Sequence, residues 1–174
     1  MENQEQFLAL LKDALEHIRE PRLFETERGF QGELLAQLRN RLDGIGLPGA
    51  PIVEQEYQKT IPNHGLNIRP DIIVHIPFDR GRAERRNQGN FVAIELKLRS
   101  TEDEARADFA KLAQMREVLG YPVTIFINID SDTTHANLLP DAIAGQTPCY
   151  AVRLEDGAPV VRIAKPAVRN YGRH

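Results

Sequence analysis

Two segments near the start of the chain have apolar residues at helical spacing. The first spans residues 4–19, and Pro21 ends or kinks it. The second spans about residues 26–42, and the glycines at 44 and 46 stop it. Their apolar positions are Phe7, Leu8, Leu11, Ala14, Leu15 and Ile18, followed by Phe30, Leu34, Leu35, Leu38 and Leu42.

A third helix is predicted over residues 100–120. Ser100 or Thr101 begins it as the cap, because acidic residues follow three positions later as in a capping box. Gly120 ends it. The buried stripe of this helix consists of Ala105, Phe109, Leu112 and Leu119.

Between and after these helices, apolar residues alternate with polar ones or form short continuous runs, which is typical of strands. The run at 122–129 is apolar throughout, as in a strand covered on both faces. The predicted strands are 52–59, 67–76 (entering the core at Ile72, Val74 and Ile76), 91–99, 122–129, 148–154 and 158–164. A turn at 61–65 and a polar loop at 77–90 separate the first three.

This order predicts an α/β (α+β) fold: a single domain over residues 1–174 with a central mixed sheet flanked by helices. Its core is about residues 26–130, with the helix at 4–19 before it and a strand-rich end at 146–174. The length of 174 residues, with 41% hydrophobic and 27% charged residues, suits one globular domain.

Charge and cysteine content narrow the class of protein. The net charge of −3 means that any phosphate-binding surface must be local. No apolar run approaches the ~20 residues of a membrane helix, and the acidic, amphipathic start does not resemble a signal peptide. A single cysteine, Cys149, forms no internal disulfide and no thiolate zinc site, so we expect a reducing, cytoplasmic location.

Charged residues interrupt two of the apolar strands. In residues 91–100, FVAIELKLRS, Glu95 and Lys97 share one strand face with Arg99, opposite the apolar face. Asp71 follows Pro70, which lacks an amide hydrogen and suits an irregular strand end. If these two strands pair across the polar loop, one carboxylate from each meets at a cleft. An isolated Glu-x-Lys is otherwise an ordinary solvated surface.

Such a pair of carboxylates, with the main-chain carbonyl of Leu96, offers the hard oxygen ligands that suit Mg²⁺. A metal held there activates water and stabilises charge at phosphorus. Lys97 then holds or deprotonates the water and offsets transition-state charge. We expect Mn²⁺ to substitute for Mg²⁺.

Pro70-Asp71 followed by Glu95-Leu96-Lys97 resembles the signature of the PD-(D/E)xK phosphodiesterase superfamily, with its restriction-endonuclease-like fold. The resemblance covers about residues 26–130 and includes the order of elements. It implies that Asp71, Glu95 and Lys97 are catalytic, and that Glu33, on the helix before the strands, assists and faces the metal. The variant of this family with glutamine and tyrosine on the next helix is not matched, since Val118 stands four residues after Gln114.

The function expected from these features is hydrolysis of DNA phosphodiester bonds by a metal-dependent nuclease. Cutting both strands of a duplex requires two active sites, so we expect a homodimer or a partner protein. The alternative is a catalytically inactive module that keeps the fold and binds nucleic acid or protein.

Several nearby groups have two interpretations. The loop arginines and Arg99 either contact phosphate or are solvated, and Arg99 alternatively pairs with Glu102 or Asp103. His75 either lines the cleft or is a satisfied histidine under the sheet. Asp108 and Lys111 are either near the site or an ordinary helix surface pair. The loop arginines are Arg80, Arg82, Arg85 and Arg86.

Overall fold

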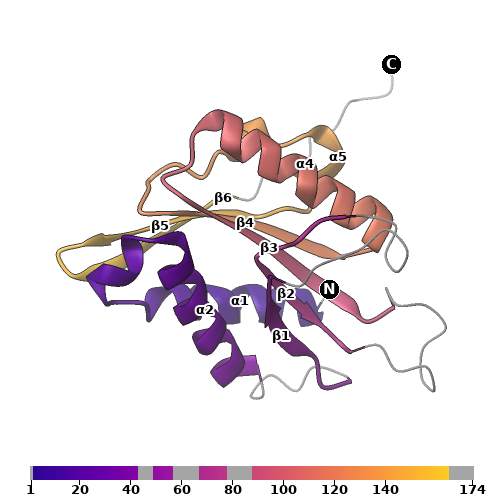
Figure 1. Cartoon of the computed structure of the whole chain (residues 1–174), viewed down its shortest axis with the longest axis horizontal. Coiled ribbons are helices and arrows are strands. Elements are labelled where there is room, and N and C mark those ends of the chain that lie inside the picture. The colour runs from indigo at the N-terminus through magenta and orange to yellow at the C-terminus, as the bar shows by residue number, and fades with distance from the viewer. Residues whose placement is uncertain (1, 43–48, 57–66, 78–87, 165–174) are drawn as a thin grey trace.

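Six strands form one mixed sheet in chain order, β1 to β6 (Figure 1). The computed structural model describes residues 2–42, 49–56, 67–77 and 88–164. The β1–β2, β2–β3 and β5–β6 pairs are antiparallel, whereas β3–β4 and β4–β5 are parallel. The strands are β1 (Ile52–Gln55), β2 (Ile72–His75), β3 (Asn90–Leu98), β4 (Val123–Ile129), β5 (Cys149–Glu155) and β6 (Ala158–Ala164). The expected mixed sheet flanked by helices is thus confirmed.

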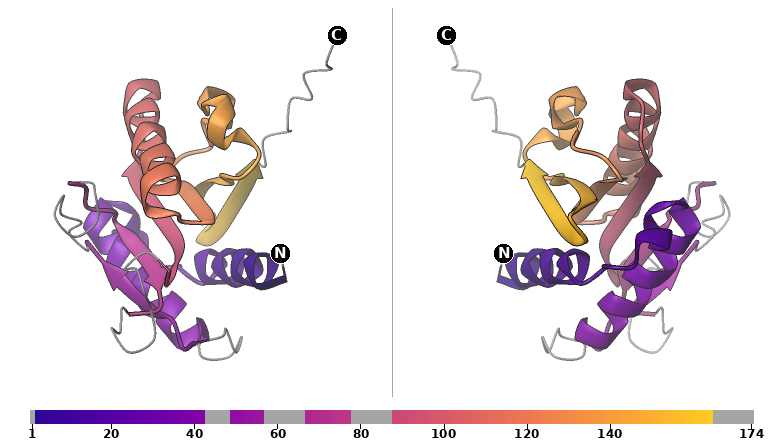
Figure 2. Two further views of the ribbon diagram at one scale, coloured as in Figure 1. Left: turned by 90° about the vertical axis from the view of Figure 1, so that its right-hand side faces the viewer. Right: turned by 90° about the vertical axis from the view of Figure 1, so that its left-hand side faces the viewer.

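Helices cover both faces of the sheet (Figure 2). Buried residues of α1 (Glu2–Glu16), η1 (Pro21–Phe24) and α2 (Glu27–Leu42) pack on one face. Those of α4 (Glu102–Leu119) and α5 (Asp141–Ala144) pack on the other, where η3 (Ala136–Leu138) also lies. The middle of the sheet is therefore buried between two helical layers, which explains why all seven residues of β4 are buried.

The alternation predicted for β3 is confirmed by the two cores. Val92, Ile94 and Leu96 belong to the core under α1 and α2, while Ala93 lies in the core under α4. Glu95 therefore also faces α4, because its side chain projects from the same side as that of Ala93.

Helix α4 has the ends that its sequence predicts. Thr101 Oγ1 accepts a hydrogen bond from the Glu104 amide, and Glu104 Oε2 accepts one from the Thr101 amide, forming a capping box. Gly120 ends the helix with φ +68, a left-handed conformation that glycine adopts without steric cost. These local signals place α4, which carries part of the site, at a defined position along the sheet.

The second strand is shorter than predicted, and its end differs. Regular pairing covers only Ile72–His75 of the expected 67–76, and the register shifts after Val74. Ile76, expected in the core, is exposed. Its amide donates to the carbonyl of Gly89, and a Cβ on Gly89 would lie only 2.2 Å from the Ile76 carbonyl oxygen. The register shift thus leaves Ile76 outside the core, where its backbone lies against Gly89.

Other boundaries differ in smaller ways. The first helix ends at Glu16 rather than 19, and β1 ends at Gln55 before Glu56, whose φ is +49. Neither α5 nor η3 was expected. The predicted turn at 61–65 lies outside the described residues. So do residues 57–59 of the first predicted strand and residues 78–87 of the predicted loop at 77–90. No helix in the described part is both long and apolar enough to cross a membrane.

Candidate functional site

The sheet splits at Asp71, immediately before β2 begins. Ile72 lies opposite Ile94, so the same antiparallel register places Asp71 opposite Glu95. The Asp71 carbonyl, however, accepts hydrogen bonds from Gln31 Nε2 at 2.7 Å and from the amide of Glu56 at 2.9 Å. The backbone of Asp71 is thus held by β1 and α2, and regular pairing of β2 with β3 begins only at Ile72, in agreement with the irregular strand end expected from Pro70.

The side chain of Asp71, rather than its backbone, bonds to β3. Its Oδ2 accepts a hydrogen bond of 2.7 Å from the Leu96 amide on β3. In a strand the amide and carbonyl of one residue point to the same edge, so the Leu96 carbonyl is directed toward this opening as well. Asp71, Glu95 and the Leu96 carbonyl therefore converge where β2 and β3 separate.

Glu95 is the most deeply buried charged group of the site. Only 1% of the residue is exposed. Its Oε2 lies 3.2 Å from Lys111 Nζ, and its Oε1 is buried and has no hydrogen-bond partner among the described residues. Burial, reinforced by the Asp71 carboxylate, raises the pKa of Glu95 well above its ordinary value, although Lys111 opposes this shift. A buried, half-satisfied carboxylate of this kind has capacity for one further cationic ligand.

Asp71 has a similar electrostatic environment. Burial raises its pKa to about 6, and the hydrogen bond from the Leu96 amide offsets part of that rise. The acids Glu27 and Asp108 raise the pKa further, and Lys111 lowers it. Two neighbouring carboxylates with raised pKa values indicate a site that gains from a bound cation.

Lys97 lies on the same strand face as Glu95, at the entrance to the site. Its Nζ is 3.4 Å from Glu27 Oε2, and the amide of Leu98 donates to that same oxygen at 3.3 Å. Burial lowers the pKa of Lys97, but the carboxylates of Glu27, Asp108 and Asp71 outweigh it, so the pKa lies above its ordinary value. Without a bound cation, Lys97 is therefore an ammonium that supplies positive charge.

Helix α2 brings Glu27 to Lys97, whereas the resemblance implied only that Glu33, on the same helix, faces the metal. Glu33 is not brought into contact with Asp71, Glu95 or Lys97. Its Oε1 accepts a hydrogen bond of 2.6 Å from Gln37 Nε2, one turn further along the helix. The sequence contained a signal for Glu27. Glu27 and Gln31 continue the buried stripe of α2 leucines toward the start of the helix at helical spacing, whereas Glu33 lies beside that stripe.

Helix α4 contributes two more charged groups. Asp108 is only 2% exposed, and its Oδ1 lies 2.8 Å from the same Lys111 Nζ that contacts Glu95. Burial lowers the pKa of Lys111, but Glu95 and Asp108 together raise it above its ordinary value. The interpretation of Asp108 and Lys111 as an ordinary surface pair is therefore wrong, since the pair joins α4 to Glu95.

The remaining candidates are distributed differently. Arg80, Arg82, Arg85 and Arg86 lie outside the described residues. Arg99 pairs with Asp130, its Nη2 lying 2.6 Å from Oδ2, and not with Glu102 or Asp103. His75 Nε2 lies 2.5 Å from Glu54 Oε2 on β1, which agrees with a satisfied histidine in the sheet.

The oxygen atoms of two carboxylates and one main-chain carbonyl suit a hard divalent cation. Among the described residues, no group of three His, Cys, Asp or Glu side chains is arranged to hold a metal. Asp71, Glu95 and the Leu96 carbonyl would offer three oxygen atoms instead, a donor set that suits the preference of Mg²⁺ for a few protein oxygens and several waters. The unpartnered Oε1 of Glu95 supports this fit.

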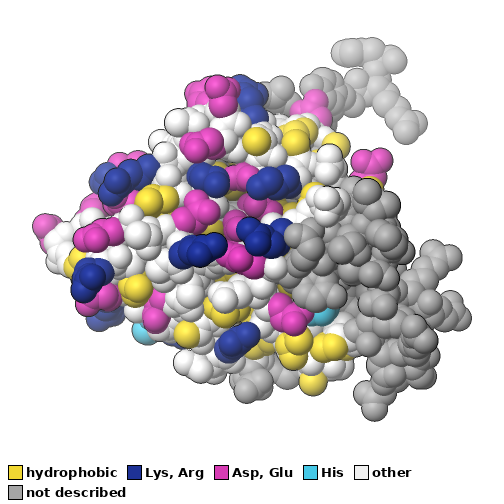
Figure 3. All heavy atoms as spheres, viewed as in Figure 1, with side chains coloured by type: hydrophobic (Ala, Val, Ile, Leu, Met, Phe, Trp, Pro, Cys, Tyr) yellow, Lys and Arg dark blue, Asp and Glu magenta, His cyan; other side chains and the backbone are white. Residues whose placement is uncertain are grey.

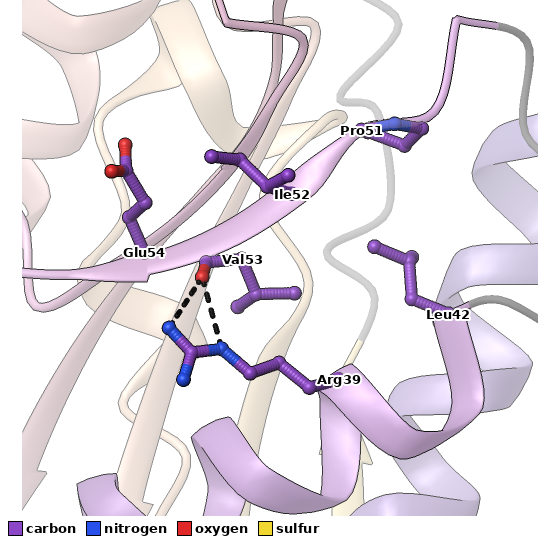
Figure 4. A pocket seen from close by; sticks show the side chains of 6 residues that line it. All are labelled: Arg39, Leu42, Pro51, Ile52, Val53 and Glu54. Carbon is purple, nitrogen blue, oxygen red and sulfur yellow. Dashed lines mark hydrogen bonds between the residues drawn. The ribbon is translucent and has the colours of Figure 1, made fainter.

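Two hollows lined by described residues lie elsewhere, at the β1 edge of the sheet. One, of about 390 Å³, is formed between α2 and β1 (Figure 4), where Arg39 donates two hydrogen bonds to the Val53 carbonyl. The other, of about 190 Å³, lies around Ile76 and Phe91. Neither is lined by Asp71, Glu95 or Lys97, so these hollows are separate from the carboxylate site.

Comparison with known proteins adds a similarity in structure alone. No protein-family model matches the chain, and no curated protein matches it in sequence. Among solved structures, that of Pyrococcus furiosus SfsA in complex with Ca²⁺ is similar, with a TM-score of 0.42 and 14% sequence identity. The match covers 76% of this chain and 62% of that one, so this chain spans less than two thirds of the SfsA chain. The site is therefore interpreted from its own contacts.

Proposed function

We propose that this protein is a metal-dependent nuclease that hydrolyses DNA phosphodiester bonds. The observation that carries the proposal is the pair of Asp71 and Glu95 where β2 separates from β3, with Glu95 Oε1 buried and unpartnered. The resemblance to the PD-(D/E)xK superfamily supports it through the same three side chains. The order of helix α2, meander β1–β3, helix α4 and strand β4 agrees with that resemblance.

Each residue has a defined role in this proposal. Asp71, Glu95 and the Leu96 carbonyl hold Mg²⁺ or Mn²⁺. When bound, the cation activates water and stabilises negative charge on the phosphate. The Lys97 ammonium neutralises charge that develops on the phosphate oxygens, and Glu27 orients Lys97 through their ion pair at 3.4 Å.

The test is cleavage of plasmid and single-stranded DNA with Mg²⁺ or Mn²⁺. We expect Asp71→Asn, Glu95→Gln and Lys97→Ala each to lower the rate by about 100-fold or more, as for loss of a charge-stabilising group. Circular dichroism must show intact folding. Full activity of Lys97→Ala would falsify the mechanism.

The two acids of α2 provide a matched comparison within this assay. Glu27→Gln removes the carboxylate beside Lys97, so we expect slower cleavage. Glu33→Gln alters an acid of the same helix whose hydrogen bond is with Gln37, so we expect a rate near that of the wild type. The opposite order of the two rates would favour the role first expected for Glu33.

A binding module without catalysis is the second candidate. It is favoured by the Lys111 ammonium, which neutralises part of the buried charge of Glu95 without any metal. A binding module would bind DNA equally well in EDTA, whereas the nuclease requires the cation to cut. Double-strand cleavage further requires a homodimer or a partner protein, so a strictly monomeric enzyme that cuts both strands at one position contradicts that extension.

A further inference from the structure

Lys111 bridges two buried carboxylates from the solvent side of the site. Its side chain is 44% exposed, and its ammonium lies 3.2 Å from Glu95 Oε2 and 2.8 Å from Asp108 Oδ1. Asp108 lies three residues earlier on the same helix, whereas Glu95 lies on β3. The lysine thus has one partner on its own helix and one on the strand that carries the proposed metal ligands.

Neither carboxylate is fully satisfied by this contact. Within the part of the chain that the structure describes, the buried atoms Glu95 Oε1 and Asp108 Oδ2 have no hydrogen-bond partner. A buried carboxylate oxygen normally has a partner, so the unpartnered oxygen of Glu95 remains available to a second cation. Asp71, whose Oδ2 accepts a hydrogen bond from the amide of Leu96, the residue after Glu95, supplies the other side of such a site.

We propose that Lys111 is a built-in counter-ion that holds Glu95 while no divalent cation is bound and yields it when one binds. This inference rests on the proposed metal site. A cation between Asp71 and Glu95 repels the ammonium, and the exposed side chain of Lys111 has room to withdraw. Asp108 retains the ammonium, because both belong to α4 and their contact is the shorter of the two.

Two consequences follow for the behaviour of the protein. Lys111 competes with the divalent cation for Glu95, so it weakens cation affinity. It also offsets the charge of buried acids in the cation-free protein, and breaking a buried ion pair by removing one partner is strongly destabilising. A lysine of merely structural role produces the second effect without the first.

The experiment is calorimetric titration of the full chain with Mn²⁺, and thermal unfolding in EDTA. The variants are Lys111→Met and the control Lys12→Met. Lys12 is similarly exposed, at 46%, and also pairs with a carboxylate on its own helix, but its partner Glu16 is itself exposed. We expect Lys111→Met to bind Mn²⁺ about tenfold more tightly or better, because a unit charge within a few ångströms of the cation is removed. Lys12→Met should match the wild type.

In EDTA we expect a lower Tm for Lys111→Met than for Lys12→Met, with the difference reduced by saturating Mn²⁺. Lys111→Arg keeps the charge and should bind Mn²⁺ with nearly wild-type affinity. If Lys111→Met does not fold, Lys111→Met combined with Asp108→Asn, compared with Asp108→Asn alone, should show the same tightening. Unchanged or weaker Mn²⁺ binding overturns the inference.

These outcomes are separable from those of the cleavage assay. Mn²⁺ binding to the wild type that Lys111→Met does not alter overturns the role of Lys111 and leaves the nuclease proposal intact. Absence of Mn²⁺ binding to the wild type overturns both. Tighter binding by Lys111→Met without DNA cleavage supports the counter-ion and contradicts only the nuclease.

Discussion

At the scale of single residues, Asp71 carries an electrostatic cost that its position imposes. Burial raises its pKa to about 6 from an ordinary value of 3.8. The folded protein therefore binds this proton more tightly than the unfolded chain does. The contribution of Asp71 to stability is consequently most favourable below about pH 4 and declines as pH rises toward 6. A bound cation reduces this cost, which is why such a residue suits a metal site better than a purely structural one.

We predict that Asp71→Asn raises the Tm in EDTA at pH 8 by about 3 °C or more, and that the gain shrinks as pH falls from 6 to 4. The amide oxygen still accepts from the Leu96 amide, while the cost of ionisation is removed. One pKa unit corresponds to about 1.4 kcal/mol, and about 1 kcal/mol shifts the Tm of a chain this size by about 2–4 °C. Asp71 is partly exposed, so solvent screening makes the gain in Tm smaller than the full pKa shift implies.

Differential scanning fluorimetry across this pH range measures the effect. Asp156→Asn is the control, because Asp156 is exposed in the β5–β6 turn and its φ of +50 is one that asparagine tolerates. Its Tm profile should follow that of the wild type. A pH-independent gain for Asp71→Asn contradicts the electrostatic explanation.

At the scale of elements, helix α4 packs on the sheet face from which Glu95 projects and contributes two charged residues there. Its start is determined by the capping box of Thr101 and Glu104, and its end by Gly120. Between them, Ala105, Phe109, Leu112 and Met115 pack on the sheet and bring Asp108 and Lys111 over Glu95. The helix position therefore determines which charges meet the strand.

We predict that Thr101→Ala lowers stability by about 1 kcal/mol, which corresponds to a fall in Tm of about 2–4 °C. The Glu104 amide loses its acceptor, and helix ends depend on such acceptors. Urea unfolding measures the effect as a lower midpoint with an unchanged slope. Thr101→Ser keeps the hydroxyl and should lie close to the wild type. A midpoint unchanged in Thr101→Ala shows that the cap contributes little.

At the scale of the whole molecule, the charges are mixed. Figure 3 shows Lys and Arg side chains interspersed with Asp and Glu on the face it presents, in keeping with the net charge of −3. Four exposed arginines nevertheless lie within two positions, along the chain, of Glu27, Asp71, Lys97 and Asp108. They are Arg28, Arg69, Arg99 and Arg106. Surface ion pairs of this kind are weak, so these arginines are available to phosphate.

We predict that Arg69→Ala weakens DNA binding and lowers the slope of log K against log salt by about 1, as for loss of one phosphate contact. Arg162→Ala is the matched control. Arg162 and Arg69 are similarly exposed, at 55% and 54%, and each pairs with one carboxylate. Arg162 lies on β6, three strands from β3. Fluorescence anisotropy, with cleavage abolished by a second substitution, measures the DNA affinity of both variants. Equal losses of affinity would contradict a DNA-binding surface near Asp71.

The sequence by itself determined the local features of this protein. Alternation along β3 predicted that Glu95 and Lys97 share a face, and Pro70 predicted an irregular strand end at Asp71. Cap residues predicted both ends of α4. These features depend on backbone geometry within a few residues, so periodicity and turn chemistry suffice to predict them.

Only the tertiary structure decided which distant groups meet. The rotation of α2 on the sheet brings Glu27 to Lys97, and the position of α4 buries Asp108 and brings Lys111 to Glu95. The register shift after Val74 exposes Ile76. Each outcome depends on packing between elements far apart in the chain, about which local periodicity carries no information. The physical reason is that the apolar stripe of a helix identifies which face is buried. The contacts of a residue at the edge of that stripe depend on how the helix packs against the sheet.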